Sequence, residues 1–195
     1  KISGSGNMND YYIGNSPFYL NKDIKEIVIG DGVTNIGDCA FWGCSSLTSI
    51  EIPDGVTSIG MSVFDSCSSL TSIEIPVGVT SLKDFVFYGC SSLTSITIPE
   101  GLTSIDGGAF QNCSSLTSIA IPAGVTSIGE SAFKDCSNLN TIYCYKNSTA
   151  DKYTDYPSIA KKVYLDDATT TAFTFNSSTG TITGYSGSEK VVNIP

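Results

Sequence analysis

Two glutamates, Glu51 and Glu74, have the residue type and spacing closest to a catalytic pair. They occupy equivalent positions in two successive repeats, 23 residues apart. Two carboxyl groups about 5–5.5 Å apart are the arrangement that retaining glycosidases use. Both residues are expected on the outer face of a shallow sheet, where nothing would exclude water or hold a substrate, and the repeat itself explains why glutamate occurs twice. We therefore predict that the protein is not an enzyme and has no catalytic residues.

Other catalytic groups and cofactor motifs are missing from the sequence. The chain contains no histidine, which excludes Ser-His-Asp and Cys-His arrangements. The glycine-containing segments at 3–6 and 184–188 lack the glycine spacing, and the strand and helix around it, of a phosphate or dinucleotide loop. We expect no cofactor.

Five of the seven cysteines recur once per repeat. Neighbouring members would be close enough for a disulfide, but equivalent side chains in a stack point in the same direction, which is poor disulfide geometry. One cysteine per repeat also does not cluster ligands around a metal ion, so no metal site is expected. We predict a column of buried free thiols that act as small hydrophobic groups: Cys44, Cys67, Cys90, Cys113 and Cys136. The pattern leaves the redox state of Cys39 and Cys144 open.

These residues belong to a repeat of 23 residues. The copy at 47–69 recurs at 70, 93, 116 and 139, and a degenerate copy starts at 24. A fixed period of this length is typical of leucine-rich repeats. One coil cannot bury its own apolar edge, and stacking the coils does so. The sequence therefore predicts a repeat solenoid of six coils, with a parallel β-sheet on one face, little helix, and a cap at each end.

Within a coil, the alternation of Ile50 and Ile52 predicts a short strand with one buried side. Pro53 and Gly55 then turn the chain, and Val56 to Ile59 is a second, shorter extended piece. A phenylalanine near the end of each coil should form a buried aromatic column: Phe41, Phe64, Phe87, Phe110 and Phe133. Trp42 stands in a column of variable polarity, which predicts either an exposed contact residue or packing against the cap.

The outward strand positions are the candidate partner-binding residues. One outward column is serine, and the next contains glutamate, threonine and an aromatic residue. Solenoids use such surfaces for binding, although a merely solvated face would show the same composition. The candidate set is Ser49, Glu51, Ser72, Glu74, Ser95, Thr97, Ser118 and Tyr143. A third column, with Thr48, Thr71, Thr94 and Thr117, should line the same face with hydroxyl groups.

Composition excludes several kinds of partner. The formal net charge is −9, and a nucleic-acid surface needs clustered Lys and Arg. The chain contains no apolar stretch long enough to span a membrane and no signal peptide. Neither the oligomeric state nor the full length of the parent protein follows from the pattern.

The two ends depart from the repeat. Residues 1–23 are expected to form an N-terminal cap, ahead of an array over 24–146. A capping-box-like start at Ser148 predicts a short helix over about 149–155, and 161–165 reads as a strand. Together, residues 147–165 would form the C-terminal cap. We expect a linker over 166–171 and a hairpin-like tail over 172–195, with a turn at 178–180, as the start of a following array.

The motif S-L-T-S-I-x-I-P-x-G-V-T-S-I-G-x-x-x-F-x-x-C over residues 24–145 resembles the BspA-like bacterial leucine-rich repeat surface proteins. In the ordinary leucine-rich pattern an Asn or Cys follows the strand; here Gly55 stands there and the cysteine is Cys67. The resemblance implies a secreted or cell-surface protein associated with adhesion to host proteins or other cells. It supplies no fixed binding residues.

Three functions follow as hypotheses. The first is a non-enzymatic protein-interaction module that binds an extracellular or host protein through the open face of the sheet. The second is a glycan-binding module that uses the aromatic residues Trp42, Tyr143 and Tyr145. The third is a structural spacer that presents other domains of a longer polypeptide.

Overall fold

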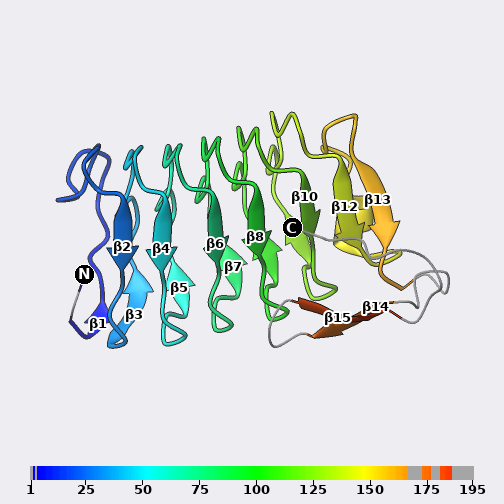
Figure 1. The fold of residues 1–195 in the computed structure, drawn as a ribbon, viewed down its shortest axis with the longest axis horizontal. Helices are drawn as coiled ribbons and strands as arrows, with labels where there is room; N and C mark the ends of the chain where they lie inside the picture. The colour runs from blue at the N-terminus through cyan, green and yellow to red at the C-terminus, as the bar shows by residue number, and fades with distance from the viewer. Residues whose placement is uncertain (1, 3, 167–172, 177–180, 186–195) are drawn as a thin grey trace.

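A computed structural model shows a stack of short coils that lie side by side along the long axis of the molecule (Figure 1). The structure describes residues 2, 4–166, 173–176 and 181–185. Each coil passes through two strand positions and one turn-rich side. Almost no helix is present in the described residues, as the short repeat predicts.

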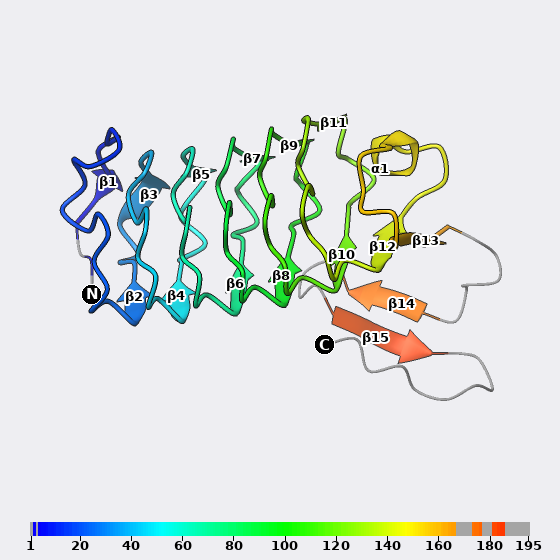
Figure 2. The same cartoon turned by 90° about the horizontal axis from the view of Figure 1, so that it is seen from above.

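Two rows of parallel strands run along opposite sides of the stack (Figure 2). The first strand row contains the Ile50-type positions: β2 (Glu26–Val28), β4 (Ser49–Glu51), β6 (Ser72–Glu74), β8 (Ser95–Thr97), β10 (Ser118–Ala120), β12 (Thr141–Cys144) and β13 (Lys161–Tyr164). The second strand row is shorter: β1 (Gly6–Asn7), β3 (Val33–Ile36), β5 (Ser58–Ile59), β7 (Ser81–Leu82), β9 (Ser104–Ile105) and β11 (Ser127–Ile128). The shorter extended piece of each coil thus also pairs with its neighbours.

The register within each row follows the 23-residue period. Ile50 pairs with Ile27, Ile73 with Ile96, and Ile119 with Ile142. In-register pairing keeps every buried isoleucine on the same face, because a shift of one residue would turn it outward.

The third side, which we call the turn side, holds the phenylalanine and cysteine columns. All five phenylalanines have no exposed surface. Successive rings from Phe41 to Phe133 stack with centroids 5.4–5.9 Å apart and interplanar angles of 4–24°. Each aromatic ring buries about 150–250 Å², so this column makes a large hydrophobic contribution to the core.

Two positions per coil on the turn side have left-handed backbone. One column contains Gly43 (φ 73°), Gly89 (φ 67°) and Asn112 (φ 64°), which tolerate this conformation. The other includes Phe85 (φ 56°), for which it is costly. The Phe85 ring lies over Gly108 of the next coil, where a Cβ would approach its Cε1 to 2.5 Å. Residue 108 must therefore be glycine, because the Phe85 ring leaves no room for a Cβ.

Residue 2 and residues 4–23 form one further, irregular coil in addition to covering the array. Ile2 bridges to Ile29, β1 pairs with β3, and Phe18 packs on Phe41 with ring centroids 5.5 Å apart. Trp42 is half-buried and stacks on Tyr19 at 4.9 Å. Of the two alternatives for Trp42, the structure shows packing against the N-terminal segment.

The C-terminal end closes the stack with helix α1 (Thr149–Lys152) and strand β13. The helix starts where the sequence predicts, with Asp151 N–H donating to Ser148 Oγ at 3.2 Å. It ends three residues earlier than predicted, because Tyr153 is extended (ψ 132°) and turns its ring onto Phe133. Strand β13 pairs in parallel with β12 and ends at Tyr164.

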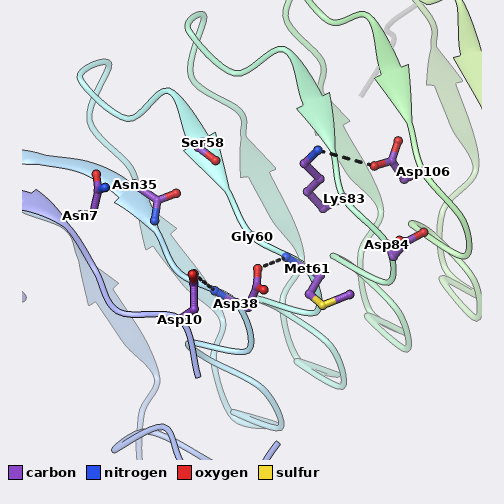
Figure 3. Close-up of a pocket in the computed structure, with 10 residues that line it drawn as sticks. All are labelled: Asn7, Asp10, Asn35, Asp38, Ser58, Gly60, Met61, Lys83, Asp84 and Asp106. Atoms are coloured by element: carbon purple, nitrogen blue, oxygen red, sulfur yellow. Dashed lines mark hydrogen bonds and ion pairs between the residues drawn. The ribbon is translucent and has the colours of Figure 1, made fainter. Parts of the chain in front are cut away.

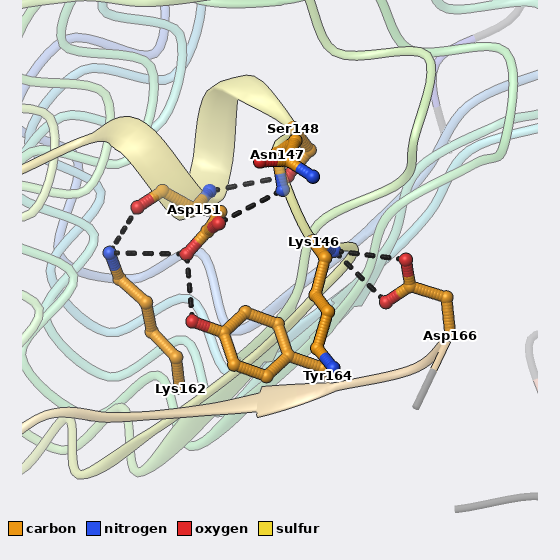
Figure 4. Close-up of polar contacts among 7 residues, drawn as sticks. All are labelled: Lys146, Asn147, Ser148, Asp151, Lys162, Tyr164 and Asp166. Carbon is orange, nitrogen blue, oxygen red and sulfur yellow. Dashed lines mark hydrogen bonds and ion pairs between the residues drawn. The ribbon is translucent and has the colours of Figure 1, made fainter. Parts of the chain in front are cut away.

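A polar network holds helix α1 to β13 (Figure 4). The Asp151 carboxylate accepts hydrogen bonds from the Asn147 N–H and the Tyr164 hydroxyl, both at 2.9 Å, and lies 3.7 Å from Lys162 Nζ. The hydrogen bond from Asn147, followed by that from Tyr164, lowers the pKa of Asp151. Lys162 also donates to the Asp151 carbonyl, which ties the helix to the last strand.

In the tail, β14 (Phe173–Asn176) and β15 (Thr181–Tyr185) pair antiparallel, as expected of a hairpin. The expected linker beyond Asp166, the turn at 178–180 and the final segment 186–195 lie outside the described residues.

Candidate interaction surface

The outward face of the first strand row contains every candidate binding residue. Its serine column is extended by Glu26 and Thr141, which pair with Ser49 and Ser118, and by Lys161, which pairs with Thr141. The second column runs from Val28 through Glu51, Glu74, Thr97 and Ala120 to Tyr143 and Val163. We call these two columns the open face.

The candidate residues differ in exposure. Those toward the N-terminal end, and Thr97, are exposed: Ser49, Glu51, Ser72 and Glu74. Ser95, Ser118 and Tyr143 are half-buried. The exposed carboxylates therefore gather at one end of the open face, and Tyr143 and Lys161 lie at the other.

Two charged members of this face were missed by the sequence analysis. Glu26 lies 23 residues before Ser49, so the repeat period alone was enough to find it. Lys161 lies outside the period, and only the pairing of β13 with β12 brings it beside Thr141. With Glu26, the acidic end has three carboxylates rather than two.

Threonines of the third outward column have a structural role where their hydroxyl groups form hydrogen bonds between coils. The Thr48 hydroxyl donates to the Lys25 carbonyl at 2.9 Å, and the Thr94 hydroxyl donates to the Thr71 carbonyl at 3.1 Å. These hydroxyl groups join successive coils, so their protons are not available to hydrogen-bond a binding partner.

The five column cysteines are free and buried. Each thiol donates a hydrogen bond to the carbonyl of the phenylalanine 26 residues before it, as Cys90 Sγ does to Phe64 at 3.1 Å and Cys136 Sγ to Phe110 at 3.0 Å. Burial raises the pKa of Cys44 to about 11 and that of Cys136 to about 12. These thiols stay protonated at neutral pH, which suits a donor role and opposes reactivity.

A hollow of about 490 Å³ lies on the second strand row (Figure 3). Three aspartates in its wall accept backbone N–H groups of the next coil: Asp10 from Asp38 at 3.1 Å, Asp38 from Met61 at 2.7 Å, and Asp84 from Gly107 at 2.8 Å. Lys83 Nζ lies 3.9 Å from the Asp106 carboxylate. The aspartates thus connect coils.

In the part of the chain that the structure describes, no three Cys, Asp or Glu side chains converge in a way that could hold a metal ion. The carboxylate of Asp65 on the turn side is half-buried, and burial raises its pKa, while hydrogen bonding from Ser66 and the nearby Trp42 indole lowers it. The Trp42 Nε1–H itself has no partner of good hydrogen-bond geometry among the described residues. We therefore do not treat Asp65, Ser66 and Trp42 as a second candidate binding site.

The chain matches the family model of the BspA type leucine rich repeat region in six copies, over residues 11–140 and 63–186. None of the curated proteins matches it. No helix in the described residues is both long and apolar enough to cross a membrane.

Solved structures of bacterial leucine-rich repeat proteins are similar to it. A leucine-rich repeat protein of T. pallidum is 30% identical, with a TM-score of 0.63 over 73% of this chain and 66% of its own. A leucine-rich cell surface protein of Faecalibacterium prausnitzii is 34% identical, with a TM-score of 0.51 over 70% of this chain and 42% of its own. A leucine-rich repeat protein of Bacteroides ovatus is 27% identical, with a TM-score of 0.60 over 82% of this chain and 45% of its own. This chain thus spans less than two thirds of the length of each of these three proteins, and by its repeat and family match it belongs to the BspA-type leucine-rich repeat family.

Proposed function

We propose that this chain is a non-enzymatic interaction module, secreted or at the cell surface, that binds an extracellular or host protein through its open face. The observation that supports the proposal most directly is the group of three exposed carboxylates at one end of that face, Glu26, Glu51 and Glu74. The description of the Faecalibacterium relative as a cell surface protein supports the location.

The chemistry of the open face favours a partner with a basic patch. Exposed carboxylates at the rim of an interface attract Lys and Arg side chains of the partner, and this attraction raises the association rate at low salt. Tyr143 at the other end offers a partly buried aromatic contact of the kind enriched in interfaces. Binding should therefore weaken as ionic strength rises.

The test is binding of the purified chain to arrays of extracellular proteins and of glycans at low and high salt. The double variant Glu51→Lys/Glu74→Lys should lower the association rate for a protein partner by about tenfold or more, because it reverses two charges. The matched control is Asp31→Lys/Asp54→Lys, which makes the same charge change at exposed turn positions outside the two columns of the open face. Equal loss in both double variants would show that only net charge matters, and unchanged binding in the first would remove the open face as the site.

The two other hypotheses are outcomes of the same test. A glycan ligand whose binding is insensitive to salt would move the site to the aromatic residues, although Trp42 is already covered by Tyr19. Absence of binding on both arrays would favour the spacer.

A further inference from the structure

The junction between coil 47–69 and coil 70–92 differs from the others in its backbone hydrogen bonds. In the first strand row, β4 forms a ladder with β2, and β6 forms one with β8, but β4 and β6 form none. In the second strand row, β5 pairs with β3, and β7 with β9, but β5 and β7 form no ladder. Strands β8 and β10 also lack a ladder, yet β9 and β11 keep theirs. Among the described coils, only this one junction is unpaired on both strand rows.

Individual bonds show the same contrast. At the next junction, Thr103 N–H donates to the Thr80 carbonyl and Asp106 N–H to the Leu82 carbonyl, both at 2.8 Å. The equivalent bonds, from Thr80 N–H to Thr57 and from Lys83 N–H to Ile59, are not formed within the described structure. The threonine hydroxyl bond that Thr103 makes to Thr80 at 2.9 Å likewise has no counterpart from Thr80 to Thr57.

The turn side of the same junction stays fully bonded. Phe64 N–H donates to the Val86 carbonyl at 2.9 Å, and Ser66 N–H donates to the Tyr88 carbonyl at 2.7 Å. The rings of Phe64 and Phe87 stack at 5.5 Å and 4°. The Cys90 thiol adds its bond to the Phe64 carbonyl at 3.1 Å. The turn side of the junction is therefore hydrogen-bonded, whereas neither strand row has a ladder across it.

Side-chain burial differs between the coils on the two sides of this junction. Ile50 and Ile52, in the coil before the junction, are only partly buried. Their equivalents in the next coil, Ile73 and Ile75, are 5% and 2% exposed. Ile96 of β8, the strand that has no ladder with β10, is also only partly buried, so reduced burial accompanies each missing ladder of the first strand row.

The hollow on the second strand row crosses the same junction (Figure 3). Ser58, Gly60 and Met61 line it from the coil before the junction, and Lys83 and Asp84 from the coil after it. The ion pair of Lys83 is with Asp106 of the following coil, so it does not connect the two coils of this junction.

We infer that this junction is a hinge, at which coils up to residue 69 and coils from residue 70 move as two bodies about the bonded turn side. Opening there breaks no ladder, whereas opening at another junction would break at least one. Glu51 and Glu74 lie on opposite sides of the hinge, so its angle sets the separation of the two carboxylates. That consequence for partner binding rests on the proposed function, while the hinge itself does not.

Hydrogen exchange of the free protein, followed by NMR or by mass spectrometry with residue resolution, tests the hinge without any partner. The amides of Thr80 and Lys83 should exchange at least about tenfold faster than those of Thr103 and Asp106, which are the matched positions one coil later. The amides of Phe64 and Ser66, on the turn side of the same junction, should stay as protected as Phe87 and Gly89.

Each other outcome overturns the inference. Equal protection at Thr80, Lys83, Thr103 and Asp106 would show that the strand rows are continuous in solution. Fast exchange of Phe64 and Ser66 together with Thr80 and Lys83 would show that the two coils separate completely, so that no axis remains for a hinge. A result that supports the hinge together with failure of the charge-reversal variant would separate the two proposals.

Discussion

The turn side and the two strand rows of this solenoid are built from the same repeat but differ in continuity. From Phe41 to Phe133, every neighbouring pair of rings stacks, and the amide of each of the first four phenylalanines bonds to a carbonyl of the following coil. The strand rows are interrupted between β4 and β6, between β5 and β7, and between β8 and β10. The turn side therefore forms a continuous spine of stacked rings and hydrogen bonds between coils. The β-ladders of the two strand rows do not run without interruption.

The largest expected effect comes from breaking the spine. Phe87→Ala should lower the free energy of unfolding by about 3–5 kcal/mol, because it removes a fully buried ring between two stacked neighbours and leaves a cavity. Urea denaturation followed by circular dichroism measures this. Glu74→Ala on the open face is the control and should change stability by less than about 0.5 kcal/mol. Similar losses in both variants would contradict the assignment of the spine to the turn side.

A second effect should appear at high pH. Burial holds the pKa of the column thiols above its ordinary value near 9.0, to about 11 for Cys44 and about 12 for Cys136. Below pH 9 the thiols are protonated in both the folded and the unfolded states, so their full contribution to the free energy of unfolding is present. Above pH 9 the unfolded chain releases protons that the folded protein retains. The free energy of unfolding should then fall by up to about 1.4 kcal/mol per pH unit for each thiol, until the folded-state pKa is reached.

Urea denaturation at pH 8, 9 and 10 with a reducing agent present measures this slope. The double variant Cys44→Ala/Cys136→Ala should show a shallower fall above pH 9, whereas tyrosine ionisation affects both proteins alike. Parallel slopes would mean that the thiols are not held protonated by burial.

A smaller effect concerns the C-terminal end of the spine, where two tyrosines pack on Phe133. The Tyr153 hydroxyl donates to the Gly129 carbonyl at 3.2 Å, whereas the buried Tyr156 hydroxyl has no partner in the described structure. Tyr153→Phe should therefore cost about 1 kcal/mol, and Tyr156→Phe should be neutral or stabilising, because it removes an unpaired buried hydroxyl. Thermal unfolding of the two matched variants compares them directly. A larger loss for Tyr156→Phe would show that its hydroxyl has a partner in solution.

The repeat itself was enough to predict several features. The 23-residue period sets the coil length, the isoleucine alternation places Glu51 and Glu74 outward, and the recurrent Phe87 and Cys90 positions predict a buried turn side. These features are local or follow from periodicity, because identical coils that stack must superimpose equivalent residues. The period also contains Glu26, although its degenerate coil has glutamate where the following coils have serine.

Other features depended on contacts that no period encodes. Lys161 reaches the open face because β13 pairs with β12, Trp42 is covered because Tyr19 of an irregular segment stacks on it, and helix α1 ends early because Tyr153 packs on Phe133. The interruption between coils 47–69 and 70–92 is likewise invisible in a near-perfect repeat. The sequence by itself determined which residues are equivalent and which are buried, whereas only the tertiary structure decided how tightly each coil meets the next, because hydrogen bonds between coils depend on spacings that identical motifs do not specify.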